Sequence, residues 1–146
     1  MSVPIRRLEA RDQAAWLALF RGYIAFYEAS VAEAVIATTW RRLIASEGDF
    51  VALVAVGDAD VPIGLAHALF HRSTWSPTWY CYLEDLFVAP ARRKQGIGRA
   101  LIEAVYREAD ARGATRTYWL TQEHNRAARA LYDRMATRAP FVQYRR

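Results

Sequence analysis

The stretch from Tyr80 to Thr121 limits the possible folds more than any other part of the 146-residue chain. It opens with "YCYLEDLFV" (80–88), an apolar and aromatic run typical of a strand inside a sheet, and closes with a second strand-like run, "ATRTYWLT" (114–121). Between them, residues 97–112 have helical spacing, and Gly113 follows just beyond the last turn. Because a strand–helix–strand crossover belongs to a sheet with helices packed on it, this stretch predicts an α/β fold.

The rest of the chain repeats the same two patterns. Helices are expected over 12–27, from Ser30 to about 46 with Ser30 as its cap, and from Asn125 to about 135 with Asn125 as its cap; strands are expected over 3–8, 50–56, 61–70 and 141–146. The turn "GDAD" (57–60) joins two of these strands into a hairpin, whereas "STWSPTW" (73–79), broken by Pro77, reads as a loop. This order of elements predicts a mixed sheet.

The composition is that of one globular domain, expected to span residues 1–146. Hydrophobic residues make up 53% and charged residues 24%, unlike a disordered chain. The net charge of +5 favours an anionic ligand, but the arginines are scattered without a recognition motif, so nucleic-acid binding is not expected. The N-terminal "MSVPIRRLEARD" lacks the apolar core of a signal peptide, and no apolar run approaches the ~18 residues of a membrane span. We therefore expect no membrane association and a cytoplasmic location.

Neither a metal site nor a reactive cysteine is expected. Cys81 is the only cysteine, which excludes an intrachain disulfide and a Cys-based zinc cluster, and its place in a buried strand predicts a small packed side chain. His67 and His71 share one face of a strand, and His124 lies near the last helix. No ligand cluster surrounds these three histidines, so ordinary structural roles are expected of them.

The turn before the predicted central helix, "RRKQGIGRAL" (92–101), has the composition of an anion site. Gly96 and Gly98 follow a strand and open a helix, where backbone N–H groups lack partners and the helix dipole is positive. Glycine lets a phosphate approach without a Cβ clash, and the three basic residues before the glycines add positive potential. The same residues also fit a plain tight turn in a solvated loop, and neither G-x-G-x-x-G nor a P-loop is complete.

Three segments together resemble the GNAT superfamily of N-acetyltransferases, over nearly the whole chain. "RKQGIG" (93–98) matches the family signature R/Q-x-x-G-x-G/A; "YLEDLFVAP" (82–90) precedes it, and "NRAARALYDRMA" (125–136) follows one strand later. The segment "WSPTWYCYLEDLFV" (75–88) further resembles the branch that holds diamine and thialysine acetyltransferases and proteins named after a yeast histone acetyltransferase. The resemblance implies a single-domain fold with a mixed, mostly antiparallel central sheet of about six to seven strands, flanked by about four helices.

Two positions depart from the family pattern. Lys94 stands where glycine is usual after the signature arginine, and Ala136 stands where glycine usually ends the last helix. Lys94 would either crowd a tight turn or add a phosphate contact. Both signature glycines, Gly96 and Gly98, are present, so the assignment is kept.

The resemblance implies acetyl-CoA as the acyl donor, and a homodimer. Amides of the signature loop would hold the coenzyme A pyrophosphate, and main-chain groups of the preceding strand would meet the acetyl carbonyl and the pantetheine. Asn125 would contact the coenzyme arm, serve as a helix cap, or do both. The cofactor-binding residues implied are Leu86, Phe87, Val88, Arg93, Lys94, Gln95, Gly96, Ile97, Gly98, Arg99, Asn125 and Tyr132.

Acetyl transfer to an amine needs one group that takes a proton from the ammonium and another that protonates the departing thiolate. By resemblance, Tyr132 in "ALYDRM" is the catalytic acid and Glu84 the catalytic, water-mediated base. A core aromatic and a partner of an arginine are their structural alternatives. Because side chains alternate along a strand, Glu84 and Asp85 are expected on opposite faces unless a bulge intervenes.

Aromatic and acidic residues in two further regions are candidates for the acceptor pocket. Aromatic faces attract ammonium groups, and a carboxylate pairs with one. In relatives both regions border the acceptor, although a core or dimer-interface role also fits these residues. The substrate-binding residues expected are Tyr23, Tyr27, Glu28, Trp75, Trp79, Glu84 and Asp85.

The sequence therefore predicts an enzyme that moves acetyl from acetyl-CoA to the primary amine of a small molecule by direct attack in a ternary complex. A polyamine, an amino acid and a lysine analogue all fit as acceptors. Acetylation of protein or peptide lysine is the alternative within the enzyme class. A non-catalytic acyl-CoA-binding regulatory module is the alternative outside it, and Tyr132 argues against the module.

Overall fold

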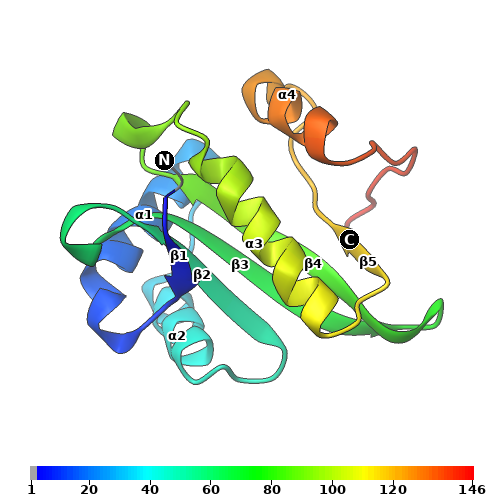
Figure 1. The fold of residues 1–146 in the computed structure, drawn as a ribbon, viewed down its shortest axis with the longest axis horizontal. Coiled ribbons are helices and arrows are strands. Elements are labelled where there is room, and N and C mark those ends of the chain that lie inside the picture. The colour runs from blue at the N-terminus through cyan, green and yellow to red at the C-terminus, as the bar shows by residue number, and fades with distance from the viewer. Residues whose placement is uncertain (1–2) are drawn as a thin grey trace.

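A computed structural model describes residues 3–146 as one five-stranded sheet with helices on both faces (Figure 1). The strands lie across the sheet in chain order: β1 (Ile5–Arg7), β2 (Phe50–Val56), β3 (Pro62–Ser73), β4 (Ser76–Val88) and β5 (Arg116–Tyr118). The first four pair antiparallel, and β5 pairs parallel with β4 because a helix connects the two. The α/β class and the mostly antiparallel mixed sheet are confirmed, with five strands in the described residues instead of six to seven.

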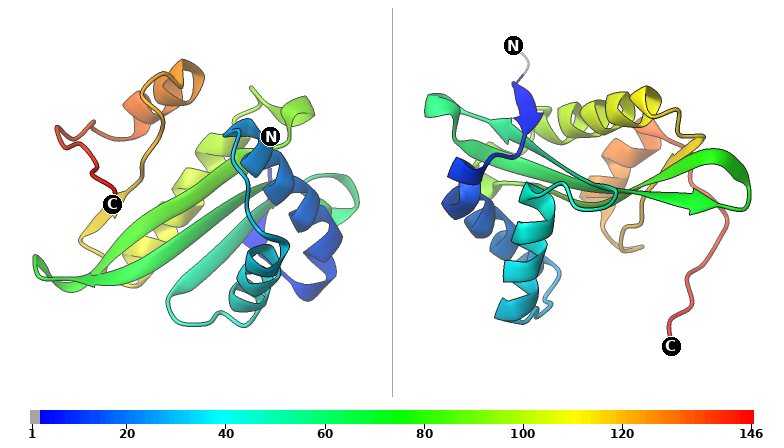
Figure 2. Two further views of the ribbon diagram at one scale, coloured as in Figure 1. Left: turned by 180° about the vertical axis from the view of Figure 1, so that it is seen from behind. Right: turned by 90° about the horizontal axis from the view of Figure 1, so that it is seen from below.

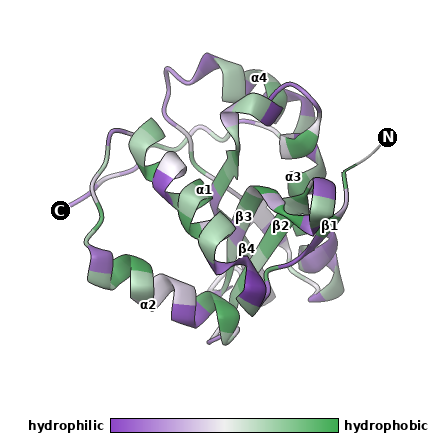
Figure 3. Ribbon diagram, turned by 90° about the vertical axis from the view of Figure 1, so that its left-hand side faces the viewer, coloured by the Kyte–Doolittle hydropathy of each residue, from purple (hydrophilic) through white to green (hydrophobic). Residues whose placement is uncertain are grey.

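The four α-helices divide between the two faces of the sheet. They are α1 (Gln13–Phe26), α2 (Glu33–Ile44), α3 (Ile97–Ala111) and α4 (Arg126–Met135), with single 3-10 turns at Ala10–Asp12, Asp58–Asp60 and Pro90–Arg92. Seen along the sheet, α1 and α2 lie on one side and α3 on the other (Figure 2, right). In Figure 3, α2 alternates between hydrophobic and hydrophilic residues, as expected of a helix that buries one side.

Two hydrophobic clusters hold these layers together because strand side chains alternate between faces. The α3-side cluster consists of Val51, Leu53, Ala55, Ala66, Ala68, Phe70, Cys81, Leu83, Ile97, Leu101, Ile102, Ala104, Val105 and Ala109. The α1-side cluster consists of Trp16, Leu19, Phe20, Ile36, Leu43, Ala52, Val54, Val56, Leu65 and Phe87. Helix α4 contributes no fully buried residue to either cluster.

Three local predictions were wrong. The segment 73–79 is not a loop, because a tight turn at Thr74 and Trp75 joins β3 directly to β4. Pro77 lies inside β4, where the register between β3 and β4 is irregular, so its missing N–H interrupts no regular ladder. Helix α2 starts later than predicted, with Ala32 and not Ser30 as its N-cap. Residues 141–146 form no strand, because no element of the described chain lies beside them to pair with, and all six are exposed.

A β-bulge interrupts β4 at the predicted base. His67 of β3 pairs with Asp85, but the next residue, Ala68, pairs with Leu83, so Glu84 is the extra residue. Strand β4 therefore changes phase. Leu83 packs in the α3-side cluster, whereas Phe87, four residues later, packs in the α1-side cluster together with its cross-strand partner Leu65. Asp85, opposite His67, shares this second face.

Strands β4 and β5 stay together only briefly. Pairing joins Tyr80–Tyr82 to Arg116–Tyr118, after which β5 ends and the chain turns toward α4. Strand β4 continues to Val88 with no neighbouring strand on that side among residues 3–146. The separation leaves main-chain groups of Leu83–Val88 without a β-ladder partner on the β5 side.

Candidate active site

A pocket lies where β4 and β5 separate. Side chains from α1, β4, the segment after β5 and α4 line it: Tyr23, Tyr27, Leu83, Glu84, Leu86, Trp119, Leu120 and Tyr132. Five of these eight were expected in the site from the sequence, in three different roles. The fold thus brings the predicted acid, the predicted base and part of the predicted acceptor pocket to one place.

Glu84 owes its position to the bulge. As the unpaired residue of β4 it is exposed at the pocket, next to Tyr82 and Asp85. Partial burial of the carboxyl group, and then the charge of Asp85, raise the pKa of Glu84. A shift in this direction makes the carboxylate a stronger base than that of an ordinary glutamate.

Asp85 is tied to two buried residues on the α1 side. Its Oδ2 lies 2.8 Å from Nδ1 of His67, and the indole Nε1 of Trp16 donates to Nε2 of His67 at 2.9 Å. The bulge was the stated condition for both carboxylates to serve one site. The bulge is present, and Tyr23 lies beside both carboxylates, of which Glu84 lines the pocket.

Tyr23 and Tyr27 form the α1 wall of the pocket. Their rings lie 5.0 Å apart in an edge-to-face arrangement, and the Tyr23 hydroxyl donates to the main-chain carbonyl of Glu84 at 3.4 Å. Burial, followed by the charge of Asp85, raises the pKa of Tyr23. Tyr23 therefore stays a neutral donor, and the two rings offer aromatic faces beside two carboxylates.

Tyr132 reaches the pocket from α4. Its ring packs edge-to-face on Trp119, with centroids 5.4 Å apart. Burial, and then the neighbouring Tyr27, raise the pKa of Tyr132 to about 12. The phenol is therefore protonated at neutral pH and available as a proton donor.

The signature loop has the geometry of an anion cradle. Gly96 is the N-cap of α3 with φ of 78°, and a Cβ built there would meet nothing within 4 Å, so the backbone is open to an approaching group. No side chain caps the first turn of this 15-residue helix. Uncapped amides at a helix start fit the pyrophosphate of coenzyme A.

The cations of the loop differ in what they contact. Arg93 donates from Nε to the Val88 carbonyl at 3.1 Å and lies over the Phe87 ring, while Arg99 pairs with Glu103. Among residues 3–146, Lys94 has no side-chain partner, and its backbone is left-handed with φ of 62°. Lys94 thus adopts the conformation for which the family uses glycine, with its charge free for a ligand.

Asn125 is the N-cap of α4, as predicted. Its Oδ1 accepts from the Ala128 amide and its Nδ2 donates to Thr121, both at 3.4 Å. Because these are long hydrogen bonds, the side chain is only weakly held by the cap. A contact to the coenzyme arm stays a prediction.

Three residues predicted to bind the acceptor lie outside the pocket. Trp75 lies at the tip of the β3–β4 hairpin, 87% exposed, and Trp79 packs partly buried on the α3-side cluster beneath Arg72. Both are outside the pocket because β3 and β4 continue past the predicted loop and carry the tip away from α1 (Figure 2). Glu28 is exposed just after Tyr27, with φ of 52°, and does not line the pocket.

Five residues at the pocket or directly behind it were missed, among them Leu83, which was predicted only as part of the strand 80–88. Trp119 and Leu120 were included in a predicted strand, but that strand ends at Tyr118 and frees both for the pocket. His67 and Trp16 were assigned structural roles because their sequence positions share no motif. The sequence held only a weak signal for the contact of His67: in a hairpin of β3 and β4, this histidine falls near the acidic pair Glu84 and Asp85.

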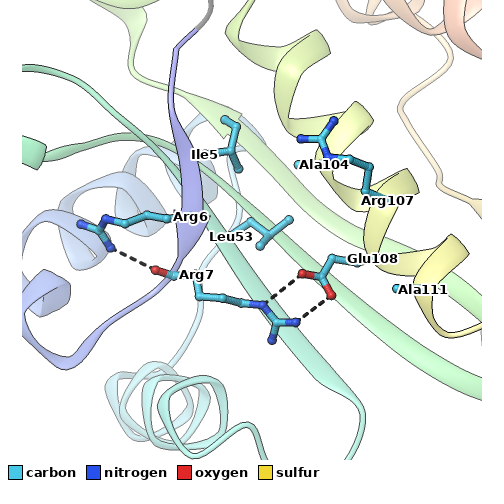
Figure 4. Close-up of a pocket in the computed structure, with 8 residues that line it drawn as sticks. All are labelled: Ile5, Arg6, Arg7, Leu53, Ala104, Arg107, Glu108 and Ala111. Carbon is cyan, nitrogen blue, oxygen red and sulfur yellow. Dashed lines mark hydrogen bonds and ion pairs between the residues drawn. The ribbon is translucent and has the colours of Figure 1, made fainter.

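A second pocket lies away from this site, between β1 and α3 (Figure 4). Its wall includes a two-point ion pair in which Arg7 donates to Glu108 at 3.1 and 2.7 Å. None of the predicted site residues lines it. The residues described also include no cluster of three metal-ligating side chains, and no helix among them has both the length and the apolar character to cross a bilayer.

Comparisons with known proteins agree with one another. The sequence model of the acetyltransferase (GNAT) family matches residues 14–136. The chain is 34% identical to the D-amino-acid N-acetyltransferase HPA3 of Saccharomyces cerevisiae, covering 99% of this chain and 90% of that protein. It is 33% identical to the thialysine N-epsilon-acetyltransferase of Caenorhabditis elegans, covering 49% of this chain and 44% of that protein.

A solved structure gives the same fold at low identity. AAC(6')-Iy, in complex with the bisubstrate analogue CoA-S-monomethyl-acetylneamine, superposes with a TM-score of 0.79 at 19% identity, covering 99% of both chains. At this identity the likeness concerns the fold.

Proposed function

Because the chain belongs to the acetyltransferase (GNAT) family, and is thus an acyl-CoA N-acyltransferase that uses acetyl-CoA, we propose that it acetylates the primary amine of a small molecule. The observation that carries the proposal is the pocket between β4 and β5, where Glu84 and Tyr132 face one space from different elements. A base and an acid on two sides of one pocket are what direct transfer in a ternary complex requires.

The residues that would hold the coenzyme follow from the open backbone of the loop. The first-turn amides of α3 and the ammonium of Lys94 would bind the pyrophosphate, and the unpaired edge of β4 at Leu86–Val88 would hold the pantetheine. Asn125 would contact the arm. When bound, acetyl-CoA supplies an acetyl group activated by its thioester.

The chain's own groups would then move two protons. Glu84 would accept, through water, a proton from the substrate ammonium, which frees the nitrogen lone pair for attack on the acetyl carbonyl carbon. As the C–N bond forms and the C–S bond breaks, Tyr132 would donate its phenolic proton to the departing sulfur. The nitrogen would lose its second proton to water as the amide forms, Glu84 would return its proton to solvent, and Tyr132 would regain one from solvent, so the balance is one amide, one thiol and one released proton.

The acceptor class is supported by the walls of the pocket. Glu84 and two tyrosine rings line the pocket and Asp85 lies beside them, which suits a compact cation because ammonium groups bind both carboxylates and aromatic faces. The related proteins are named for small amine acceptors, a D-amino acid and thialysine. Amino acids and lysine analogues therefore come before polyamines and peptides as candidates.

The organisation of the protein is also a proposal. We propose a single domain over residues 1–146 that forms a homodimer and is located in the cytoplasm. Support for the dimer comes from Phe141, Val142 and Tyr144, which are 87%, 77% and 92% exposed on a segment beyond the last helix.

A screen of acceptors tests the proposed function. The purified full chain would be incubated with acetyl-CoA and with D- and L-amino acids, thialysine, polyamines, aminoglycosides and lysine peptides, and free thiol would be measured over time. We expect thiol release above the hydrolysis background with at least one small amine, accompanied by a mass gain of one acetyl group on that amine. Turnover only with peptides would support the protein-lysine alternative. Tight acetyl-CoA binding without any turnover would support the non-catalytic module.

A further inference from the structure

We propose that Trp16 and His67 are positioning residues for the reaction, joined in a buried relay that orients the carboxylate of Asp85 toward the amine acceptor. The inference rests on the proposed function, because it assigns Asp85 to the binding of the substrate ammonium. It goes beyond that function by giving a role to two side chains behind the pocket that do not touch it.

The hydrogen-bond inventory determines the state of His67. An indole N–H can only donate, so Nε2 of His67 must accept from Trp16 at 2.9 Å. The proton of the neutral ring is then on Nδ1, which donates to Oδ2 of Asp85 at 2.8 Å. A charged ring would place two N–H donors against each other at the Trp16 contact. His67 is therefore a neutral donor and not itself a general base.

The relay is rigid because its inner members are enclosed. Trp16 and His67 are 1% and 2% exposed, and the Trp16 ring packs against Phe20 and Trp40 with centroids 5.1 and 5.2 Å away. The Asp85 side chain, 16% exposed, is where the relay reaches the surface. A buried donor that cannot rotate fixes the plane of the carboxylate it binds.

Asp85 lies beside two residues that line the pocket, its chain neighbour Glu84 and the α1 residue Tyr23. His67 occupies Oδ2, and Tyr23, whose pKa is raised first by burial and then by the Asp85 charge, lies next to the same carboxylate. The charged and titratable groups around Asp85 are Glu84 and Tyr82 from β4, His67 from β3, and Tyr23 from α1. No lysine or arginine neutralises Asp85 among the ion pairs of residues 3–146, so its charge is available to a cationic ligand.

The two neighbouring carboxylates therefore have different roles in the reaction. Glu84 sits on the bulge without a cross-strand partner, is more exposed, and is the mobile group that shuttles a proton. Asp85 is paired across the strands with His67 and is the fixed charge that orients the ammonium nitrogen. Without a fixed charge, a small amine bound only by Glu84 could rotate away from the acetyl carbon.

A pair of conservative variants separates the two hydrogen bonds of His67. Asparagine places its amide near the Nδ1 position and keeps a donor for Asp85, whereas glutamine reaches the Nε2 position and keeps only the acceptor for Trp16. With the best acceptor from the screen, we expect His67→Gln to raise KM for the amine about tenfold without changing KM for acetyl-CoA, and His67→Asn to stay within about twofold of the parent. His71→Gln, an exposed histidine on the same strand, is the control.

Equal effects of the two His67 variants, or a rise in both Michaelis constants together, would overturn the relay in favour of a structural role. Thermal unfolding checks that each variant folds. If a His67 variant does not, Trp16→Phe replaces it, since losing the indole donor frees Nε2 and should produce the same selective rise in KM for the amine.

A readout without substrate keeps this inference separate from the proposed function. The ¹⁵N shifts of the His67 ring, assigned by loss of its signal in His67→Asn, should report a neutral ring protonated at Nδ1 throughout the neutral pH range. A charged ring, or a proton on Nε2, would refute the relay even if the enzyme acetylates amines. If the expected tautomer is found and no amine is acetylated, the proposed function is wrong, and the role of Asp85 in binding the substrate is wrong as well.

Discussion

At the scale of single residues, Tyr132 carries the most direct prediction. Tyr132→Phe should bind acetyl-CoA as the parent does, because the ring is kept. Its turnover should be about 10²–10⁴-fold slower, because the phenolic proton is removed. Calorimetry measures the binding and thiol release the turnover. Parental turnover in this variant would show that another group protonates the sulfur.

Tyr106 offers a matched control for that variant. It is also partly buried near Trp119, but its hydroxyl donates to the Met135 carbonyl at 3.0 Å and lies outside the pocket. Tyr106→Phe should cost stability by about 1 kcal/mol for the lost hydrogen bond and leave turnover unchanged. The two variants together separate proton donation from the packing of α4.

The raised pKa of Glu84 predicts a pH dependence. A base works in its charged form, and a raised pKa means that this form appears at a higher pH than for an ordinary glutamate, near 4.3. The rise of kcat/KM for the amine with pH should therefore begin above that value, and Glu84→Gln should remove this limb and lower the rate about 10²-fold. The limb due to the amine's own deprotonation, at higher pH, should persist. A parental profile in Glu84→Gln would assign the base elsewhere.

Lys94 is the clearest case of one residue with two possible effects. Its left-handed backbone costs about 1–2 kcal/mol relative to glycine, which lacks a Cβ. If its ammonium binds phosphate, Lys94→Gly should keep or raise Tm while weakening acetyl-CoA binding about three- to tenfold, and Lys94→Arg should bind as the parent does. A higher Tm with unchanged affinity would show that Lys94 only tolerates the turn.

Residue roles could be predicted from the sequence only where a motif carried them. Gly96, Asn125 and Tyr132 stand at fixed distances in matching segments; the structure has Gly96 and Asn125 as N-caps of α3 and α4 and Tyr132 in the pocket wall, and their roles toward the coenzyme stay predictions. The Asp85–His67 contact could not be predicted in this way, because it depends on a strand register that one extra residue shifts. Trp79 was misplaced for the related reason that the extent of β3 and β4 was unknown.

At the scale of elements, α3 and α4 should differ in stability. Helix α3 buries six residues, whereas α4 buries none and packs through the partly buried Leu131, Tyr132 and Met135. Amides of α4 should therefore exchange with solvent at least about 100-fold faster than those of α3, since local opening costs less where little apolar surface is lost. Hydrogen-exchange mass spectrometry measures this, and coenzyme A should slow exchange in α4. Equal protection of both helices without ligand would contradict it.

The elements with strong local signals were the most predictable. Helix α3 with its following Gly113, and strand β2 over residues 50–56, match their predicted limits closely because glycine positions and apolar runs mark their ends. The segment 141–146 has the residue pattern of a strand but forms none. A strand needs a neighbouring strand to pair with, and the residue pattern does not show whether one is present. Pro77 likewise predicted a break in the strand, but it lies at the second residue of β4, where the strand tolerates a proline.

At the scale of the whole molecule, the exposed C-terminal segment predicts the assembly state. The C-terminal segment, red in Figure 2, leads away from the sheet, and a second copy could cover its exposed residues Phe141, Val142 and Tyr144. Light scattering should give twice the mass of one chain at micromolar concentration, and Phe141→Asp should shift it toward one chain by placing a charge in the interface. Gln143→Asp, which adds the same charge at a polar position, is the control. A single-chain mass for the parent at every concentration would rule out the dimer.

The bulge at Glu84 has a consequence for how such an enzyme could change over generations. Because the two halves of β4 are out of phase, the number of residues in this strand is constrained more strictly than their identity: deleting one residue would exchange the environments of Phe87 and Leu86, whereas replacing Glu84 moves no core residue. Substitution at this position is therefore nearly free of cost to folding, while shortening is not. The scaffold therefore accepts a change of side chain at the very point where it forbids a gap, so a point mutation there alters the pocket wall without a loss of the fold.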